Sequence, residues 1–427
     1  MTLAILGGTP VRTKEWPQWP RSDSGTLRNL SQVLSSARWA ISGPFIGTES
    51  YERQFSSAYA QFHGIRYCVP TANGSSALAI ALEALGVTHG SEVLVPGLTW
   101  VACASSVAGL GAIPVLVDVD PDTLCMSPEA AAAAVSSRTA AILLVHLFSA
   151  VARVEEFSRL STTTGIPLLE DCSQAHGASW KGQRTGTFGT IGVFSMQQTK
   201  VLTCGEGGAA ITDDARLYDL LQQLRADGRR YRNDAVAPGM MELEEIGAIQ
   251  GRNSCLSEFH AAILLDRLRH LDAENARRAR NAACLTVMLE QVGGITAQGC
   301  NPEVDRRTYY HYCVRVDRQE FSGASIDCIA AALTAELGIL IEPVDDPLNQ
   351  NVLYRPLLSG RTPKDDGFRK RVDPRQYDLP VACAARDSCI TFPHRILLGT
   401  DDELSDVAEA FAKVKRQACL LGVKRES

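Results

Sequence analysis

The chain has 427 residues, of which 45% are hydrophobic and 21% charged, a composition typical of a globular protein with sizeable cores. Its net charge of −6 argues against a nucleic-acid partner, and its 13 scattered cysteines argue against a disulfide framework or a metal site such as structural zinc. The most apolar stretch, residues 140–151, is too short to span a bilayer, and the N-terminus lacks a secretory pattern. We therefore expect a cytoplasmic protein with no membrane partner.

The first fifty residues show no strong periodicity, and an alternating pattern then runs from about residue 60 to residue 215. Apolar runs rich in Val, Ile and Leu predict strands of a sheet that is covered on both faces. Helical patterns lie between them, which predicts an α/β domain with a mostly parallel sheet whose ligands bind beyond the carboxyl ends of the strands. The predicted strands are 92–96, 113–119, 140–148, 166–171, 191–196 and 208–213, and the predicted helices are 75–85 and 154–165.

The pattern changes after residue 256. Residues 257–293 predict one long helix, 309–317 a strand and 325–338 a further helix. We therefore expect two domains: an N-terminal arm with a large ligand-binding domain over 1–256, and a linking helix with a smaller C-terminal α+β domain over 257–427.

The segment "TANGSSALAIALEALG" predicts a helix whose start could bind an anion. Asn73 is a good N-cap, Gly74 allows close approach of the backbone, and Ser75 opens the helix. Free N–H groups at a helix start attract negative charge. Plain helix capping explains the same residues, so the motif alone does not decide between the two interpretations.

Two further motifs place polar groups at the ends of predicted strands. In "IPLLEDCSQAHGA" the strand ends at Asp171, with Gln174 close behind it and His176 expected to be a packed, hydrogen-bonded residue. In "FSMQQTKVLTCGEGG" a strand ends near Ser195, and Lys200 follows before a glycine-rich turn. A lysine that forms an imine needs such a fixed setting.

Together these groups suit pyridoxal 5′-phosphate. Its aldehyde needs an amine such as that of Lys200, its phosphate needs a helix start, and its pyridine nitrogen needs a carboxylate such as that of Asp171. Trp100, which follows the strand 92–96, could cover the flat ring.

The order of "NGSSAL", "PGLTWVA", "EDCSQAHGA", "FSMQQTKVLTCGEGG" and "GRNSCLSEFHAAIL" resembles the DegT/DnrJ/EryC1/StrS sugar aminotransferase family. The resemblance runs from about residue 30 into the C-terminal domain. It implies the aspartate-aminotransferase-like fold, which is fold type I of the pyridoxal-phosphate enzymes.

The resemblance also implies residue roles. Lys200 would hold the cofactor and carry the proton, and Asp171 would pair with the pyridine nitrogen. Trp100 would cover the ring, and Gln174 would contact its hydroxyl side. The phosphate would be held by Gly74, Ser75, Ser195 and, from the neighbouring subunit of a homodimer with shared active sites, Asn253.

Residues 347–356 and 393–399 resemble the aminocyclitol branch of the family. This implies transfer of an amino group from L-glutamine, or glutamate, to a keto-cyclitol such as scyllo-inosose or 2-deoxy-scyllo-inosose in aminoglycoside antibiotic biosynthesis. Tyr354 and His394 are the candidate substrate contacts. The chain departs from many members at Ser254 and Cys255, after the Asn, and in the loop that contains Ser149 and Val151.

Several alternatives remain open at this point. An aminotransferase of this kind could act on a nucleotide-linked keto-sugar instead. A lyase with the same cofactor is a weaker candidate, because the relatives concerned have His in place of Lys200. A non-catalytic regulatory protein that binds the cofactor, or an α/β binding protein without it, belongs to a different class.

Overall fold

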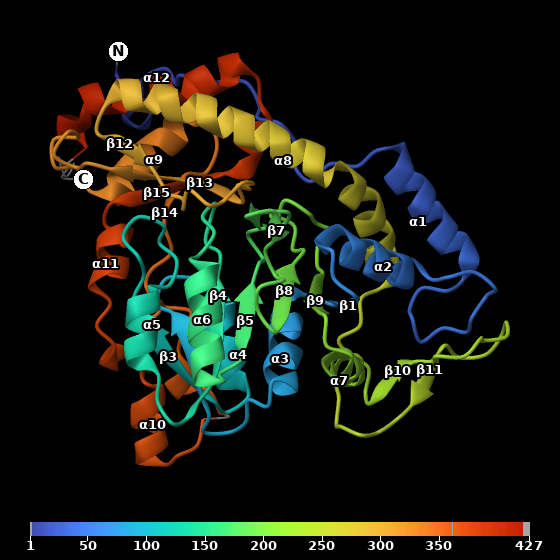
Figure 1. Cartoon of the computed structure of the whole chain (residues 1–427). Helices are drawn as coiled ribbons and strands as arrows, with labels where there is room; N and C mark the ends of the chain where they lie inside the picture. The colour runs from blue at the N-terminus through green and yellow to red at the C-terminus, as the bar shows by residue number, and fades with distance from the viewer. Residues whose placement is uncertain (1, 361, 422–427) are drawn as a thin grey trace.

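Two main β-sheets organise the chain, which the computed structural model describes over residues 2–360 and 362–421 (Figure 1). The larger sheet has seven strands in the order β1-β9-β8-β5-β4-β2-β3. Strand β9 runs antiparallel to both of its neighbours, and the neighbouring pairs from β8 to β3 run parallel. The predicted α/β class with a mostly parallel sheet is therefore confirmed.

The strands of this sheet lie close to their predicted positions. Every predicted strand overlaps an observed one, and the run at 92–96 coincides with β2. The prediction omits β1, a short strand that contains Pro70. The structure places β1 at the sheet edge, where proline is tolerated. The strands are β1 (Tyr67–Thr71), β2 (Glu92–Pro96), β3 (Ile113–Val117), β4 (Thr139–Val145), β5 (Leu168–Asp171), β8 (Ile191–Ser195) and β9 (Gly208–Thr212).

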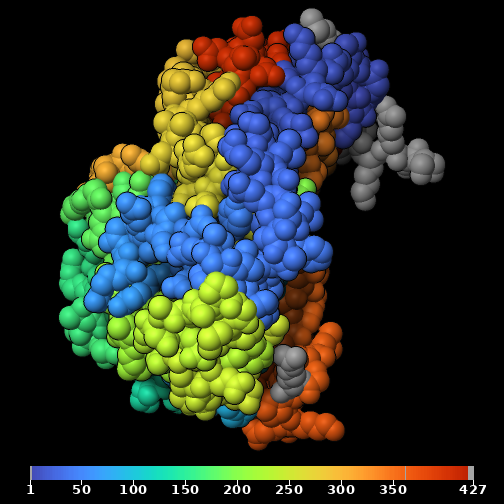
Figure 2. All heavy atoms as spheres, turned by 90° about the vertical axis from the view of Figure 1, so that its right-hand side faces the viewer, coloured from blue at the N-terminus to red at the C-terminus, as the bar shows by residue number. Residues whose placement is uncertain are grey.

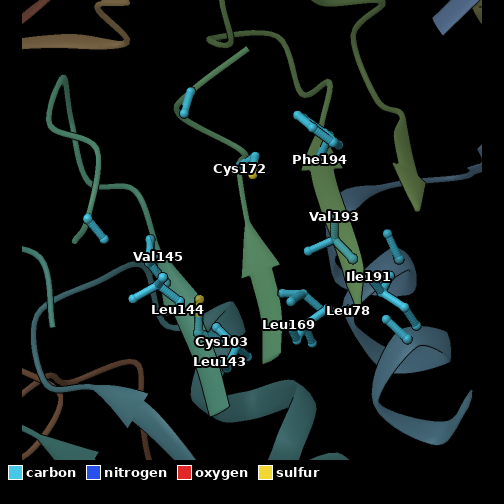
Figure 3. Packing of buried hydrophobic residues seen from close by; sticks show 14 of the residues in the cluster. Leu78, Cys103, Leu143, Leu144, Val145, Leu169, Cys172, Ile191, Val193 and Phe194 are labelled. Atoms are coloured by element: carbon cyan, nitrogen blue, oxygen red, sulfur yellow. The ribbon is translucent and has the colours of Figure 1, made fainter. Parts of the chain in front are cut away.

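Helices cover both faces of the larger sheet (Figure 1). Helix α3 (Gly74–Ala84) contacts α4 (Ala102–Gly109) and α7 (Ala215–Arg225), whereas α5 (Pro128–Ala134) contacts α6 (Val154–Thr164). Figure 3 shows part of the core, in which Leu78 of α3 lies near Leu169 and Ile191 of the sheet. Burial on both faces explains why these strands are continuous apolar runs.

A four-stranded antiparallel sheet, in the order β12-β13-β15-β14, forms the second unit. Helices α8, α9 and α12 pack beside it (Figure 1). The elements are α8 (Glu258–Val292), β12 (Ile295–Ala297), β13 (His311–Val316), α9 (Ile326–Leu337), β14 (Glu342–Pro343), β15 (Cys389–Pro393), the 3-10 helix η4 (His394–Leu398) and α12 (Asp401–Arg416).

The predicted division at residue 256 stays a prediction, and two segments pack across it. Leu3 and Trp16, at the start of the chain, lie in the core beneath the smaller sheet. Leu348 and Leu379, late in the chain, lie in the core of the larger sheet. The later segment includes η2 (Pro356–Leu358), α10 (Asp366–Val372), η3 (Pro374–Gln376) and α11 (Pro380–Arg386), which lie beside the larger sheet in Figure 1.

The remaining elements are short or peripheral. Helices α1 (Ser24–Ser36) and α2 (Tyr51–His63) contact α8, and the pairs β6–β7 and β10–β11 form small ribbons. Within the described part of the chain, no helix is both long and apolar enough to cross a membrane. The other bounds are η1 (Ala4–Leu6), β6 (Ser179–Trp180), β7 (Gln183–Arg184), β10 (Arg229–Tyr231), β11 (Leu243–Glu245) and η5 (Ala418–Leu420).

Candidate active site

The candidate residues gather at the carboxyl edge of the parallel strands. Strand β5 ends at Asp171 and its parallel neighbour β8 ends at Ser195, with Asp171 paired in register with Val193. The turn with Lys200 follows β8, and Trp100 lies between the end of β2 and helix α4. The topology therefore brings the predicted amine and carboxylate to one edge of the sheet.

Asp171 is buried, and its carboxylate has two donors within the protein. The backbone N–H of Ser173 donates to Oδ1 at 2.9 Å, and the thiol of Cys103 donates to Oδ2 at 3.3 Å. Burial, reinforced by the Asp171 charge, raises the pKa of Cys103 well above its ordinary value, so the thiol keeps its proton. The carboxylate is thus held in place in a site that favours a further cationic or N–H partner.

Lys200 is half-buried in the turn 197–200. Its backbone N–H donates to the carbonyl of Gln197 at 2.8 Å. Its Nζ lies 3.8 Å from the ring centroid of Tyr310, which is a cation–π contact. The Tyr310 hydroxyl lies 3.0 Å from Oγ1 of Thr199, so the aromatic ring is fixed to the same turn.

The start of α3 approaches the end of β8 very closely. The side chain of Asn73 accepts a hydrogen bond from Ser76 N at 2.8 Å and caps the helix, as predicted. A Cβ added to Gly74 would lie 2.6 Å from Cβ of Ser195, so only glycine fits there. The structure therefore brings Gly74 and Ser195 together, with the exposed Ser75 beside them.

Three more predicted residues lie at or beside this edge. Trp100 is 53% exposed, an unusual setting for so large an apolar ring. Gln174 is buried, and its side-chain oxygen accepts a hydrogen bond from Phe148 N at 2.6 Å. His176 is a packed residue, as expected: it contacts the Tyr59 hydroxyl at 2.9 Å and the carbonyl of Ser195 at 2.8 Å, and burial lowers its pKa to about 4.

The other predicted residues have different surroundings, and their roles stay predictions. The side chain of Asn253 is exposed, although the neighbouring carbonyl of Ser254 accepts a hydrogen bond from Ala72 N at 2.8 Å. Tyr354 is buried in the core of the larger sheet. His394 is also buried, and both of its ring nitrogens have partners within the protein.

The sequence prediction missed three residues around the amine and the carboxylate. Cys103 is not part of any recognisable motif. Tyr310 reaches the site because β13, which it precedes, lies close to the larger sheet, and no local sequence pattern reveals that proximity. Burial raises the pKa of Asp345, the charge of Glu342 raises it further, and the Lys200 charge opposes both. The sequence "DDPLN" gives no sign that its first carboxylate is partly buried in the same electrostatic environment as Lys200.

The arrangement fits the predicted cofactor. A flat, phosphorylated aldehyde needs an amine, a fixed carboxylate, a backbone cradle and an uncovered aromatic face. Lys200, Asp171, the glycine-only contact at Gly74 and the exposed ring of Trp100 supply these four features along one sheet edge. The fold and the site thus define an α/β enzyme of the aminotransferase class.

Comparison with known proteins gives the family. A model of the DegT/DnrJ/EryC1/StrS aminotransferase family matches residues 22–412, and the chain belongs to this family. It is 49% identical to an L-glutamine:scyllo-inosose aminotransferase of Streptomyces griseus over 97% of both chains. It is 48% identical to an L-glutamine:2-deoxy-scyllo-inosose aminotransferase of Streptomyces kanamyceticus over 98% of both chains.

The crystal structure of 3-amino-5-hydroxybenzoic acid synthase superposes on this structure with a TM-score of 0.80 at 29% identity, covering 95% of this chain and 100% of that one. The predicted family and fold are confirmed, and the protein is an aminotransferase.

Proposed function

We propose that this aminotransferase uses pyridoxal 5′-phosphate to move an amino group from L-glutamine to a keto-cyclitol of the scyllo-inosose type. The observation that carries the proposal is the placement of Lys200 and Asp171 at one sheet edge, after the neighbouring strands β8 and β5, beside the tight contact between Gly74 and Ser195. The names of the relatives at 49% and 48% identity support glutamine as donor and an inosose as acceptor. We further propose that this reaction belongs to aminoglycoside antibiotic biosynthesis.

When bound, pyridoxal 5′-phosphate supplies an aldehyde that exchanges amines and a ring that withdraws electrons from the reacting carbon. Lys200 would hold the cofactor between turnovers, and its freed Nζ would take the α-proton of the donor and return a proton two bonds away, across the nitrogen. The carboxylate of Asp171 would pair with the pyridine nitrogen, which favours a proton on that nitrogen. A positioned amine of this kind contributes a rate factor of about 10² to 10⁴.

The other residues bind and orient. The N–H groups at the start of α3, with Ser75 and Ser195, hold the phosphate, because the helix start carries partial positive charge. Trp100 covers the ring, and Gln174 contacts its hydroxyl side. We further propose that Tyr354 contributes to the acceptor pocket.

We also propose a homodimer in which Asn253 of one copy reaches the phosphate site of the other. Figure 2 shows residues 37–63 and 226–253 side by side on one face of the molecule. Both segments carry exposed large apolar side chains. The backbone N–H of Phe45 donates to the carbonyl of Met240 at 2.8 Å, which joins the two segments into one surface. Such exposed apolar surface indicates a protein partner, here a second copy of the chain. The residues are Trp39, Ile46, Met240, Met241 and Ile246.

We propose a cytoplasmic location for the protein. The cysteines carry free thiols, in keeping with that location.

The direct test compares acceptors. Purified protein supplied with glutamine should aminate scyllo-inosose or 2-deoxy-scyllo-inosose and leave a nucleotide-linked keto-sugar unchanged, as followed by mass spectrometry. Lys200→Ala is the control, because it removes the amine and leaves the phosphate and ring contacts. Preference for the nucleotide-linked sugar, or no turnover of either inosose, would contradict the proposed acceptor.

A further inference from the structure

Side chains from two distant parts of the chain hold the main chain of the Lys200 turn. Nε2 of His394, in η4, lies 3.1 Å from the carbonyl oxygen of Thr199. Nε1 of Trp19, in the N-terminal segment, donates to the carbonyl oxygen of Lys200 at 3.2 Å. Two consecutive carbonyl groups of the turn therefore have hydrogen-bond partners from outside the larger sheet.

Arg278 determines which ring nitrogen of His394 carries the proton. Its Nε, which can only donate, lies 3.2 Å from Nδ1 of His394, so Nδ1 accepts this hydrogen bond. The single proton of the neutral ring is then on Nε2, which donates to Thr199. Burial, with the positive charge of Arg278, lowers the pKa of His394 well below its ordinary value, so the ring stays neutral.

We call the hydrogen bonds from Trp19 and His394 to the turn the clamp, and both side chains are themselves held in place by neighbours. Arg278 of α8 is completely buried, and its Nη1 donates to Oδ1 of Asn275 at 3.0 Å. The Trp19 ring meets the His394 ring edge to face, with 4.7 Å between centroids and 86° between planes. The guanidinium of Arg278 also lies 5.0 Å from the Trp19 ring centroid. The N-terminal segment around Trp19, helix α8 and η4 thus pack together next to the turn that carries Lys200.

We propose that His394 and Trp19 are positioning residues that fix the main chain of Lys200, and that His394 acts in this way rather than by touching substrate. The inference rests on the proposed function of Lys200. Both ring nitrogens of His394 are engaged within the protein, so neither is directed to a substrate. The side chain of Lys200 itself has four rotatable carbon–carbon bonds and cannot hold its amine in place alone.

The proposed chemistry explains why such a clamp is needed. Lys200 must release the cofactor, carry a proton and bond to the cofactor again in every cycle. During the free interval, its main chain and the ring of Tyr310 would keep Nζ near the reacting carbon. A misplacement of about 1 Å at a reacting group can cost about 100-fold in rate. Removing the hydrogen bonds to the carbonyl groups of Thr199 and Lys200 should therefore lower the rate of proton transfer without weakening the binding of either substrate.

The test uses matched variants. His394→Phe keeps an aromatic ring and removes both nitrogens, and His394→Gln keeps a donor for Thr199. Trp19→Phe removes the indole N–H from Lys200. Trp16→Phe is its control, because Trp16 Nε1 donates to the carbonyl of Leu337 at 2.8 Å, away from the turn. Each variant is assayed for kcat and KM, and for hydrogen exchange of residues 196–202 in the cofactor-free protein.

We expect His394→Phe and Trp19→Phe to lower kcat about tenfold, to leave both KM values within about twofold, and to speed exchange of the turn. His394→Gln should recover most of kcat, and Trp16→Phe should match the wild type. A raised KM for the acceptor at unchanged kcat in His394→Phe would overturn the inference in favour of a substrate contact. Unchanged kcat and exchange in Trp19→Phe would overturn it as well, even if His394→Phe does not fold. Hydrogen exchange in the cofactor-free protein separates failure of this inference from failure of the proposed function.

Discussion

At the scale of single residues, the site consists of a carboxylate and an amine, and neighbouring side chains hold both groups in place. Asp171 is held by one backbone N–H and by the thiol of Cys103, and Lys200 rests on the ring of Tyr310. The sequence motifs predicted the two charged groups, because they follow buried strands. The motifs could not reveal Cys103 or Tyr310, because these residues reach the site only through packing of α4 and of the smaller sheet.

Cys103→Ala should lower kcat about three- to tenfold, because a hydrogen bond to a charged group contributes about 1.5 to 3 kcal/mol, part of which water restores. Cys103→Ser keeps a donor and should lose less. Cys125→Ala is the control, since that thiol is also buried but donates to the carbonyl of Ala150, at 3.9 Å, rather than to a carboxylate. Steady-state kinetics at saturating substrates measure the effect, and equal losses in Cys103→Ala and Cys125→Ala would assign the change to packing alone.

Asp345→Asn should make the protein more stable at neutral pH. Burial raises the pKa of Asp345 above its ordinary 3.8, so the folded chain binds this proton more tightly than the unfolded chain. The free energy of unfolding therefore falls as pH rises through the window between 3.8 and the raised pKa. The Asn variant lacks this loss, and urea unfolding at pH 7 should show a higher midpoint than wild type, with a difference that shrinks as the pH falls through that window toward 3.8.

Asp346→Asn serves as the comparison for Asp345→Asn. Asp346 pairs with Nε of Arg386 at 2.8 Å, so its removal should be neutral or cost up to about 1 kcal/mol. A lower unfolding midpoint for Asp345→Asn than for Asp346→Asn would show that the first carboxylate is stabilising, contrary to the account.

At the scale of elements, the start of α3 packs so closely against the end of β8 that position 74 has no room for a side chain. Gly74→Ala should weaken cofactor binding at least about tenfold and lower stability by about 1 to 3 kcal/mol, because its Cβ would lie 2.6 Å from Ser195 Cβ. Gly109→Ala, in α4, has open space around the added atom and should change neither. Cofactor titration and urea unfolding measure both effects, and equal behaviour of the two variants would contradict the cradle.

The elements also show where sequence patterns are sufficient. The buried parallel strands and α3 were predicted within a few residues, because continuous apolar runs and capping residues are local signals. The expectation that the first fifty residues lack strong periodicity is wrong at α1, where Leu27, Leu30, Val33 and Leu34 have helical spacing. Asp23 caps this helix by accepting from Gly25 N at 2.7 Å and Thr26 N at 3.1 Å. The return of residues 344–386 to the larger sheet depends on tertiary packing, which periodicity does not encode.

At the scale of the whole molecule, the account requires two copies with composite sites. Mixing Lys200→Ala with Asn253→Ala, after partial unfolding to exchange subunits, gives hybrid dimers in which one of two sites carries both wild-type residues. Activity should then rise from near zero to about a quarter of the wild-type value. No recovery, although mass spectrometry shows hybrids, would mean that Asn253 serves the site of its own chain or none.

The central claim is that the amine of Lys200 holds the cofactor. Borohydride reduction of the native protein, followed by proteolysis and mass spectrometry, tests this most directly. The account predicts a reduced phosphopyridoxyl group on Lys200 and none on a buried control such as Lys413, which is paired with Glu336 at 2.8 Å. A label on another lysine, or no label on protein that turns over its substrates, would contradict it.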